Sequence, residues 1–267
     1  MSLRTIDVRD KAKYDTLHVD GSFSFPWNRI QYECGALPAR SCELEVIFDD
    51  DVQINEVEIY LSRLCYRSLS FRHFDRVDSS KKSSAYFNGF CWNPNPFLER
   101  IIDRIEEHGI GSVLDVGCGS GRDMLYLAAR GWLSVGLDNR SSLLTNCQHL
   151  CLKYNLLCRV TVCRIDIRQG VPFRRGTFDV VNICRFIHRE SLPSVLSLLK
   201  VGGHLVYSHF LEGCEHTPVG HPKTSDGYFY RKELEQMLTA NGFVILIQEE
   251  TTLSDTRPFV NILAEKL

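Results

Sequence analysis

Short apolar runs alternate with amphipathic stretches from residue 99 to the end of the chain. The apolar runs predict strands, and apolar positions three or four apart predict helices. Strict alternation of strand and helix is typical of a doubly wound, mostly parallel α/β sheet with helices on both faces. The last two strands have no helix between them, so we expect an antiparallel hairpin at one edge of a seven-stranded sheet. The predicted strands cover 113–116, 134–138, 159–164, 178–184, 204–208, 243–248 and 259–264, and the predicted helices cover 99–108, 124–130, 141–154, 191–199 and 231–240.

Signals at the helix ends and between the blocks refine this picture. Ser141 or Ser142 is expected to cap the helix at 141–154, and Gly202-Gly203 follows the helix at 191–199. The first 75 residues predict a smaller α/β domain with a strand at 44–48. The polar stretch Ser79-Ser-Lys-Lys-Ser-Ser84 is typical of a linker. We therefore expect domains at 1–75 and 91–267, joined by a linker at 76–90.

Composition favours a soluble enzyme. The 267 residues suffice for two modest domains, and a net charge of −2 gives no overall attraction to nucleic acid or an anionic membrane. No apolar run reaches the about 18 residues of a membrane-spanning helix, and the first residues lack the features of a secretory signal. Eleven cysteines without a C-x-x-C pair favour reduced, mostly buried thiols over a zinc site. We therefore expect a cytoplasmic protein with no metal and no membrane contact.

The segment Val113-Leu-Asp-Val-Gly-Cys-Gly-Ser-Gly-Arg-Asp123 carries most of the functional information. A buried strand runs into a glycine turn and then a helix, which lets a nucleotide-like ligand lie against bare backbone. The next strand ends in Asp138, whose carboxylate can hydrogen-bond a ribose diol. The spacing is G-x-G-x-G, with Arg122 where a dinucleotide fingerprint has its third glycine. Asp115 and Asp123 would repel a pyrophosphate, so they suit a ligand with a cationic amine and a sulfonium.

This loop resembles the first motif of class I S-adenosylmethionine (SAM) methyltransferases. The resemblance implies SAM as cofactor, S-adenosylhomocysteine (SAH) as product and methyl transfer as the activity. Asp166 and Ile167 would then face the adenine, and a buried Asp115 would need the ligand's amine as its partner. A glycine-rich turn in another doubly wound protein is the plainer alternative. The residues expected to bind the cofactor are Asp115, Gly117, Cys118, Gly119, Asp138, Asn139, Asp166, Ile167 and Cys184.

Three further segments are similar to small-molecule methyltransferases of the tellurite-resistance and thiopurine group. The resemblance implies a small-molecule acceptor with a thiol, chalcogen or oxygen nucleophile. His188 is the first choice for a catalytic base because imidazole titrates near neutral pH, with Arg185 beside it at the methyl group. Packing at a helix start is the plainer role for His188. Trp92, Arg189 and His209 are expected to line the substrate pocket. The segments are Asn88-Gly-Phe-Cys-Trp-Asn-Pro-Asn-Pro-Phe-Leu98, Arg185-Phe-Ile-His-Arg189 and His209-Phe-Leu-Glu-Gly213.

The start of the chain resembles the opening of a rhodanese domain. The segments that carry this resemblance are Thr5-Ile-Asp-Val-Arg9 and His18-Val-Asp-Gly-Ser-Phe-Ser-Phe-Pro26, with Tyr14 between them. That family carries its nucleophilic cysteine on the loop after the strand read here at 44–48. This chain has Asp49-Asp-Asp51 there, and three carboxylates would repel a thiolate. We therefore expect a degenerate rhodanese-like domain without sulfurtransferase chemistry, and an unrelated small α/β domain is the alternative.

Two other functions stay open at this level. An RNA or protein methyltransferase is one, because seven arginines between 159 and 189 could bind phosphates, although alternate strand positions would scatter them over two faces. A SAM-binding scaffold without catalysis is the other, because a cofactor motif reports binding and not turnover. The acceptor, the oligomeric state and the role of the first domain stay open. The arginines are Arg159, Arg164, Arg168, Arg174, Arg175, Arg185 and Arg189.

Overall fold

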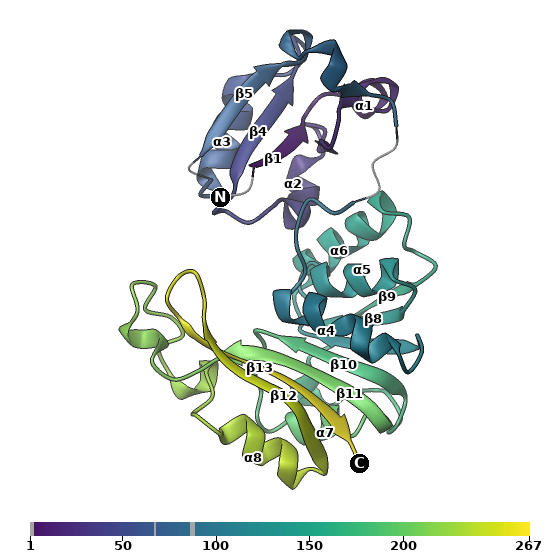
Figure 1. Cartoon of the computed structure of the whole chain (residues 1–267), viewed down its shortest axis with the longest axis vertical. Coiled ribbons are helices and arrows are strands. Elements are labelled where there is room, and N and C mark those ends of the chain that lie inside the picture. Colours follow the sequence, from purple (N-terminus) through teal and green to yellow (C-terminus); the bar gives the residue numbers. More distant parts are fainter. Residues whose placement is uncertain (1–2, 67, 86–88) are drawn as a thin grey trace. The chain divides into compact units, whose positions relative to one another are not determined.

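A computed structural model describes residues 3–66, 68–85 and 89–267, and the chain divides into two compact units, Met1–Asn93 and Pro94–Leu267 (Figure 1). Each unit contains its own sheet and its own buried apolar residues. Asn88, which opens one of the motif segments, and the stretch 86–88 of the predicted linker lie outside the described residues. The domain limits expected at 75 and 91 stay predictions.

The second unit is built on a seven-stranded sheet. Its strands are β7 (Ser112–Val116), β8 (Leu133–Asp138), β9 (Val160–Arg164), β10 (Phe178–Cys184), β11 (Leu199–Phe210), β12 (Phe243–Thr252) and β13 (Pro258–Lys266). They lie in the order β12-β13-β11-β10-β7-β8-β9, in which β7 to β11 are parallel and β13 is antiparallel to both of its neighbours. The predicted mostly parallel sheet with an antiparallel edge hairpin is confirmed. The glycine-loop strand β7 lies beside β10, where the strand order reverses and open α/β sheets bind their ligands.

Helices cover both faces of this sheet (Figure 1). They are α4 (Pro96–Glu106), α5 (Arg122–Ala129), α6 (Ser141–Lys153), α7 (Leu192–Leu196) and α8 (Glu233–Ala240), with 3-10 turns at Ile167–Gln169, Cys214–His216 and Ser225–Gly227. Apolar side chains of α4 and α5 pack with Val113 and Val180 on one face. Those of α7 and α8 pack with Leu114 and Val181 on the other. Because successive strand residues point to opposite faces, the central strands must be apolar on both.

The boundary between α7 and β11 differs from the sequence prediction. The helix expected at 191–199 ends at Leu196, and Leu199 begins β11, where it pairs with Phe178. The helix does end before Gly202-Gly203, as expected, but it ends earlier than 199, and both glycines lie inside the strand. The pairing of β10 with β11 is irregular at this point, and Gly202 takes a φ of +75°, which glycine adopts without strain.

Two helix starts also differ. The N-cap of α6 is Arg140, with no side-chain cap, so the prediction of Ser141 or Ser142 as cap was wrong. The side chain of Asp138 accepts the N–H of Arg140 at 2.9 Å and turns the chain into the helix one residue earlier. Helix α4 begins at Pro96, before the expected 99, because Asn95 caps it and proline suits the first helical turn.

The first unit holds a four-stranded parallel sheet in the order β3-β1-β4-β5. This confirms a smaller N-terminal α/β sheet, and its rhodanese identity stays a prediction. Strand β6 pairs with β2, so part of the segment expected as a linker is held by this unit. The elements are β1 (Leu3–Asp7), α1 (Lys11–Thr16), β2 (His18–Val19), β3 (Phe23–Ser24), α2 (Ile30–Glu33), β4 (Glu43–Phe48), α3 (Ile54–Arg63), β5 (Leu69–His73) and β6 (Lys82–Ser83), with 3-10 turns at Cys34–Ala36, Phe74–Arg76 and Ser79–Lys81.

Three whole-chain properties bear on the expected class of protein. Among the described residues, no helix combines the length and apolar character needed to cross a bilayer. All eleven cysteines are free thiols. Within the same part of the chain, no three His, Cys, Asp or Glu side chains come together as metal ligands.

Candidate functional site

The glycine loop between β7 and α5 is fastened to the neighbouring strand. The N–H of Gly117 donates to the Leu137 carbonyl at 2.8 Å. Gly117 has a φ of +72°, and a Cβ there would lie 2.8 Å from the side chain of Phe186. At Gly119, with a φ of +56°, the nearest atom to a Cβ would be 3.9 Å away, on Leu143. The loop is therefore packed at its first glycine and faces open space at its second.

A cavity of about 340 Å³ opens at the carboxyl ends of the parallel strands, and we name it the strand-end cavity. Its size falls within the range of about 300–1,000 Å³ typical of small-molecule sites. Its walls come from the glycine loop, the end of β8 and the turns after β9 and β10. The residues that line it include Gly117, Asp138, Asn139, Asp166, Ile167, Phe186, Ile187 and His188.

Asp138 is oriented by backbone groups on either side. Its two carboxylate oxygens accept the N–H groups of Gly119 and Arg140 at 3.0 and 2.9 Å. The residue is 8% exposed and lines the strand-end cavity. Because two carboxylate oxygens offer about four acceptor positions, Asp138 keeps capacity for hydroxyl donors from a ligand.

Asp166 and Ile167 form another wall of the same cavity. Arg168 donates to both oxygens of Asp166 at 2.8 and 2.6 Å. These bonds lower the pKa of Asp166 to about 2, so its carboxylate is ionised. A contact with an adenine amine would use the remaining lone pairs of Asp166, and it stays a prediction.

His188 is tied to that wall through Ser191. Its Nδ1 lies 2.7 Å from the Ser191 hydroxyl, which donates to the Ile167 carbonyl at 3.1 Å. Since the carbonyl can only accept, the hydroxyl proton points to Ile167 and the serine oxygen accepts Nδ1–H from His188. The neutral imidazole therefore has its lone pair on Nε2.

A cluster of polar side chains lies at the ends of β7 and β10 and the start of α5. Asn182 donates to Asp115 at 2.9 Å and to Asp123 at 3.4 Å. Burial raises the pKa of both carboxyls, and the charge of Asp123 raises that of Asp115 further. Asn182 is fully buried, and its Oδ1 has no partner among the described residues. Asp123 also accepts the N–H of Asn95 at 2.7 Å, and the charges of Arg122 and Arg185 lower its pKa. Burial outweighs these contacts, so a primary ammonium group placed here would stabilise both carboxylates.

A second cavity, of about 590 Å³, lies between the turn after β10 and the loop after β11, and we name it the loop cavity. Phe186 and Ile187 line both cavities, so one backbone turn separates them. The hydroxyl of Tyr207 donates to the Phe186 carbonyl at 2.8 Å and fixes this turn. Arg185, which lines the loop cavity, has a φ of +56°, a conformation that costs a non-glycine residue roughly 1–2 kcal/mol. Strain of this kind concentrates at functional sites.

His209 is a buried polar residue of the loop cavity. It is 2% exposed, and its Nε2 lies 3.1 Å from the Gly227 carbonyl. That oxygen only accepts, so Nε2 carries the proton and Nδ1 has a lone pair. Nδ1 has no partner within the described part of the chain. Burial lowers the pKa of His209 to about 4, so the ring is neutral at physiological pH.

Arg189 is engaged by the protein itself. It pairs with Glu233 of α8 and donates to the carbonyls of Ser225 and Tyr228, both at 2.7 Å. These contacts fasten the loop after β11 to the rest of the unit. Its expected contact with an acceptor stays a prediction that this arrangement does not favour.

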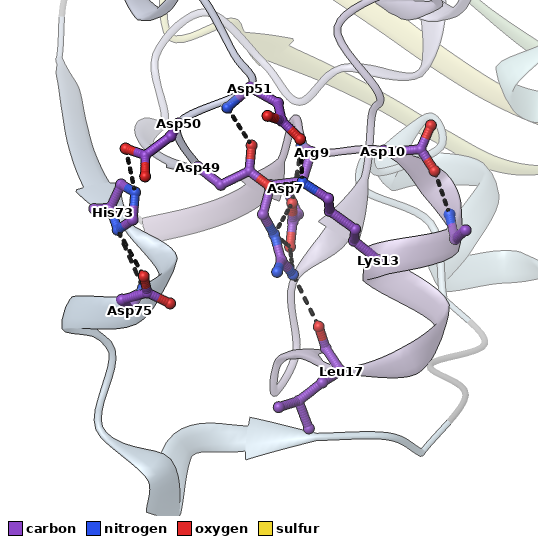
Figure 2. Close-up of polar contacts among 11 residues, drawn as sticks. Asp7, Arg9, Asp10, Lys13, Leu17, Asp49, Asp50, Asp51, His73 and Asp75 are labelled. Atoms are coloured by element: carbon purple, nitrogen blue, oxygen red, sulfur yellow. Dashed lines mark hydrogen bonds and ion pairs between the residues drawn. The ribbon is translucent and has the colours of Figure 1, made fainter.

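In the first unit, the loop after β4 holds Asp49, Asp50 and Asp51, at the place where the predicted rhodanese resemblance would put a nucleophilic cysteine. Figure 2 shows Lys13 between Asp49 and Asp51, at 2.6 and 2.5 Å, and His73 beside Asp50. The two carboxylates raise the pKa of Lys13, and Lys13 lowers that of Asp51. The acids of this loop are thus engaged in ion pairs with Lys13 and His73.

The structure brings together a large part of the predicted site. Gly117, Asp138, Asn139, Asp166, Ile167 and His188 line the strand-end cavity, and Arg185 and His209 line the loop cavity. Cys118, Gly119, Asp115, Cys184 and Arg189 are not among the residues that line either cavity. Burial raises the pKa of the Cys118 and Cys184 thiols. Trp92 belongs to the first unit, and its place at the pocket stays a prediction.

Sequence reasoning missed the roles of Asn182 and Ser191, and it included Phe186 only within the segment 185–189, without a role of its own. Asn182 left a signal: it is an amide inside the otherwise apolar run of β10, where a buried polar group needs partners. Ser191 and Phe186 left none, because their roles depend on which turn each faces.

Comparisons with known proteins agree with this geometry. Residues 113–203 match the family model described as a methyltransferase domain. An uncharacterized protein of Schizosaccharomyces pombe is 24% identical over 99% of this chain and 94% of its own length. The 18S rRNA (guanine-N(7))-methyltransferase bud23 of the same yeast is 36% identical over 31% of this chain and 29% of its own. A 2-heptyl-1-hydroxyquinolin-4(1H)-one methyltransferase of Mycobacteroides abscessus is 32% identical over 35% of this chain and 33% of its own.

Solved structures share the fold. TehB from Haemophilus influenzae matches with a TM-score of 0.50 and 22% identity over 63% of this chain and 62% of TehB. Magnesium protoporphyrin IX methyltransferase from Synechocystis PCC 6803, solved with bound SAH, matches with a TM-score of 0.51 and 19% identity over 64% of this chain and 81% of its own.

At residues 113–203 the chain therefore carries a class I SAM-dependent methyltransferase domain, with SAM as methyl donor. The site fits this donor on its own terms. Asp138 offers acceptor positions at the strand-end cavity, and the raised pKa values of the buried Asp115 and Asp123 suit a nearby cation such as the amine of SAM. The resemblance noted in the glycine loop is confirmed at this level.

Proposed function

We propose that this chain transfers the methyl group of SAM to a small molecule with a thiol, chalcogen or oxygen nucleophile, bound in the loop cavity. The single observation that carries the proposal is the common wall of Phe186 and Ile187 between the two cavities. A donor on one side and an acceptor on the other would meet at this turn. The size of the loop cavity also suits a small molecule.

On the donor side, each wall of the strand-end cavity would contact a different part of SAM. Asp138 would hold the ribose hydroxyls, and Asp166 with Ile167 would face the adenine. Asp115, Asp123 and Asn182 would hold the amine. SAM supplies a methyl group already activated by the sulfonium, so the protein's task is to orient the two reactants and exclude water.

On the acceptor side, His188 remains our first choice for a base, because its lone pair is fixed on Nε2 by Ser191. It lines the strand-end cavity together with Asp166, so Nε2 would have to reach past Phe186 to an acceptor. The competing role is a hydrogen bond from the adenine amine to Nε2. Arg185 would contact the acceptor directly from the loop cavity.

An RNA acceptor is the second candidate, favoured by the similarity to the 18S rRNA methyltransferase. The arginines give it little support. Arg159 directly precedes the edge strand β9 and Arg164 ends it, and they donate to the carbonyls of Gly131 and Asn139. Arg168 and Arg189 are paired with carboxylates. A continuous phosphate-binding face would need these guanidinium groups free.

The experiment measures SAM binding by calorimetry and SAH release with two kinds of acceptor, thiophenols and 18S rRNA fragments. We expect SAM binding and SAH release with a thiophenol. Release with RNA alone would replace the proposal by its second candidate, and SAM binding without release from any acceptor would favour a scaffold.

A further inference from the structure

We propose that the loop cavity selects an aromatic acceptor that carries a negative charge, held by Arg185 and Lys223 and hydrogen-bonded to Nδ1 of His209. This inference rests on the proposed function and narrows its substrate class.

The first observation is an unpaired guanidinium beside the cavity. Three arginines lie over the aromatic rings around it: Arg185 over Phe210 and Phe259, Arg257 over Phe210 and Arg189 over Phe229. Arg257 is paired with Asp255, and Arg189 with Glu233. Arg185 lines the cavity and makes no ion pair within the described ranges 3–66, 68–85 and 89–267, although its charge lowers the pKa of Asp123 and Asp255 from a longer distance. Its charge is therefore available to a ligand.

The second observation is the charge of the lining. Lys223 lines the cavity on the opposite loop and has no carboxylate partner among the residues that the structure describes. Among the described residues, Asp226 is the only acid that lines this cavity. Two permanent cations thus face one carboxylate, in a chain whose net charge is −2. An anion is the ligand that this local excess attracts.

The third observation is the shape and chemistry of the rest of the wall. Phe186, Ile187, Phe210 and Pro222 give it an apolar surface. Aromatic rings prefer offset or edge contacts with such side chains and bury a large apolar area. The wall therefore suits a flat apolar body with its charge at one end.

The fourth observation is the orphan lone pair of His209. A ring that is 2% exposed with no partner for Nδ1 among the described residues lacks a hydrogen-bond donor. A ligand N–H, O–H or S–H group supplies one. A carboxylate alone would not, so the acceptor has a donor in addition to its charge.

An aromatic thiol with a carboxylate meets these requirements, and the reaction balances without a further reactant. The thiolate sulfur forms a bond to the methyl carbon while the bond from methyl to sulfonium breaks. The sulfonium charge and the thiolate charge cancel, and the carboxylate is unchanged. The thiol enters protonated, with its S–H donated to Nδ1 of His209, and it loses this proton to solvent to give the thiolate that reacts.

The test compares 4-mercaptobenzoate with its methyl ester, which has the same ring and thiol but no carboxylate. SAH release gives kcat/KM for each, and calorimetry on the SAH-loaded protein gives each affinity. We expect both values to favour the acid by roughly ten- to a hundredfold, the worth of a hydrogen bond to a charged group. Lys223→Gln should reduce the preference severalfold, while Arg175→Gln, an exposed arginine outside the lining, should preserve it.

An ester that binds and reacts as well as the acid would overturn the inference, and so would failure of both probes to bind SAH-loaded protein. An unchanged preference in Lys223→Gln would remove Lys223 from the proposal and overturn it in the form given. Failure of the wild type to bind SAM would instead overturn the proposed function. The failure of this inference and the failure of the proposed function are therefore distinguishable.

Discussion

Gly117 and Gly119 have similar backbone conformations but different surroundings. Alanine substitutions at the two positions can therefore distinguish effects on stability from effects on SAM binding. Alanine at either position costs roughly 1–2 kcal/mol in the left-handed region. At Gly117 the new Cβ also meets Phe186 at 2.8 Å, whereas at Gly119 it has room. We expect Gly117→Ala to lower the unfolding temperature of the free protein clearly more than Gly119→Ala does.

SAM affinity tests the role of the second glycine, Gly119. Gly119→Ala is expected to bind SAM at least about tenfold more weakly while it stays folded, because its Cβ enters open space beside Asp138. Thermal unfolding and calorimetry measure both effects. Unaltered SAM affinity in Gly119→Ala would show that the ligand does not approach this glycine.

The carboxyls of Asp115 and Asp123 predict a pH dependence of stability. Their pKa values are raised in the folded state, so their contribution to stability is fully present below about pH 4, where an unfolded aspartate titrates, and is lost as pH rises. The loss should extend to about pH 8, the value to which the pKa of Asp115 is raised. We expect the free energy of unfolding of the wild type to fall relative to that of Asp123→Asn over this window.

Denaturant unfolding at several pH values measures this difference. Saturating SAM should offset the loss, because its ammonium group neutralises the cluster. Parallel curves for wild type and Asp123→Asn would contradict the argument.

His188 and Ser191 provide a test of the base. If His188 takes a proton from the acceptor, His188→Ala should lower turnover by about 10²-fold or more and leave SAM affinity nearly unchanged. Ser191→Ala should have a smaller effect, because the imidazole loses only the partner that fixes its tautomer. A drop in SAM affinity with little change in turnover at saturation would move His188 to the adenine.

At the residue level, the sequence predicted which side chains line the strand-end cavity more readily at the ends of strands than inside turns. Asp138 and Asp166 come directly after apolar runs, so their place at one sheet edge follows from parallel topology. Phe186 and Ser191 act through positions in a turn, which no periodicity encodes. The engagement of Arg189 by Glu233 also depends on a partner 44 residues away.

At the scale of elements, Arg189 ties the loop between β11 and α8 to the start of α8, in addition to the contact of His209 with the Gly227 carbonyl. Arg189 joins Glu233, Ser225 and Tyr228, and hydrogen bonds to a charged group contribute about 1.5–3 kcal/mol each. Arg189→Met should therefore increase amide hydrogen exchange in 213–229 by at least about tenfold, without a comparable change in the central strands. Arg174→Met, an exposed arginine with no side-chain bond in the described structure, is the matched control. Equal exchange in both variants would show that the loop is held by other contacts.

Element types were predicted well and their limits less well, for a physical reason. The run at 204–208 is the buried centre of β11, and the strand extends to Leu199 only because β10 is there to pair with it. Likewise β12 and β13 lengthen each other beyond their apolar centres. Pairing partners are non-local, so a local pattern cannot contain them.

At the scale of the whole molecule, the first unit is expected to be inactive as a sulfurtransferase. The loop after β4 carries Asp49, Asp50 and Asp51, and Lys13 is already paired with two of them (Figure 2). A thiosulfate and cyanide assay should therefore give no thiocyanate above background. Production lost on mutation of Cys34, Cys42 or Cys65 would show that the nucleophile loop lies elsewhere.

The common wall of Phe186 and Ile187 also affects how the substrate range of such an enzyme changes in evolution. A substitution in this wall alters the donor and acceptor sides at once. Each gain in activity on a new acceptor therefore risks a loss of SAM affinity. Residues 221–224, on the far side of the loop cavity, line this cavity and not the strand-end cavity. Lineages that exchange one acceptor for another are expected to vary there first, and directed evolution that randomises 221–224 should recover altered specificity with an intact cofactor site.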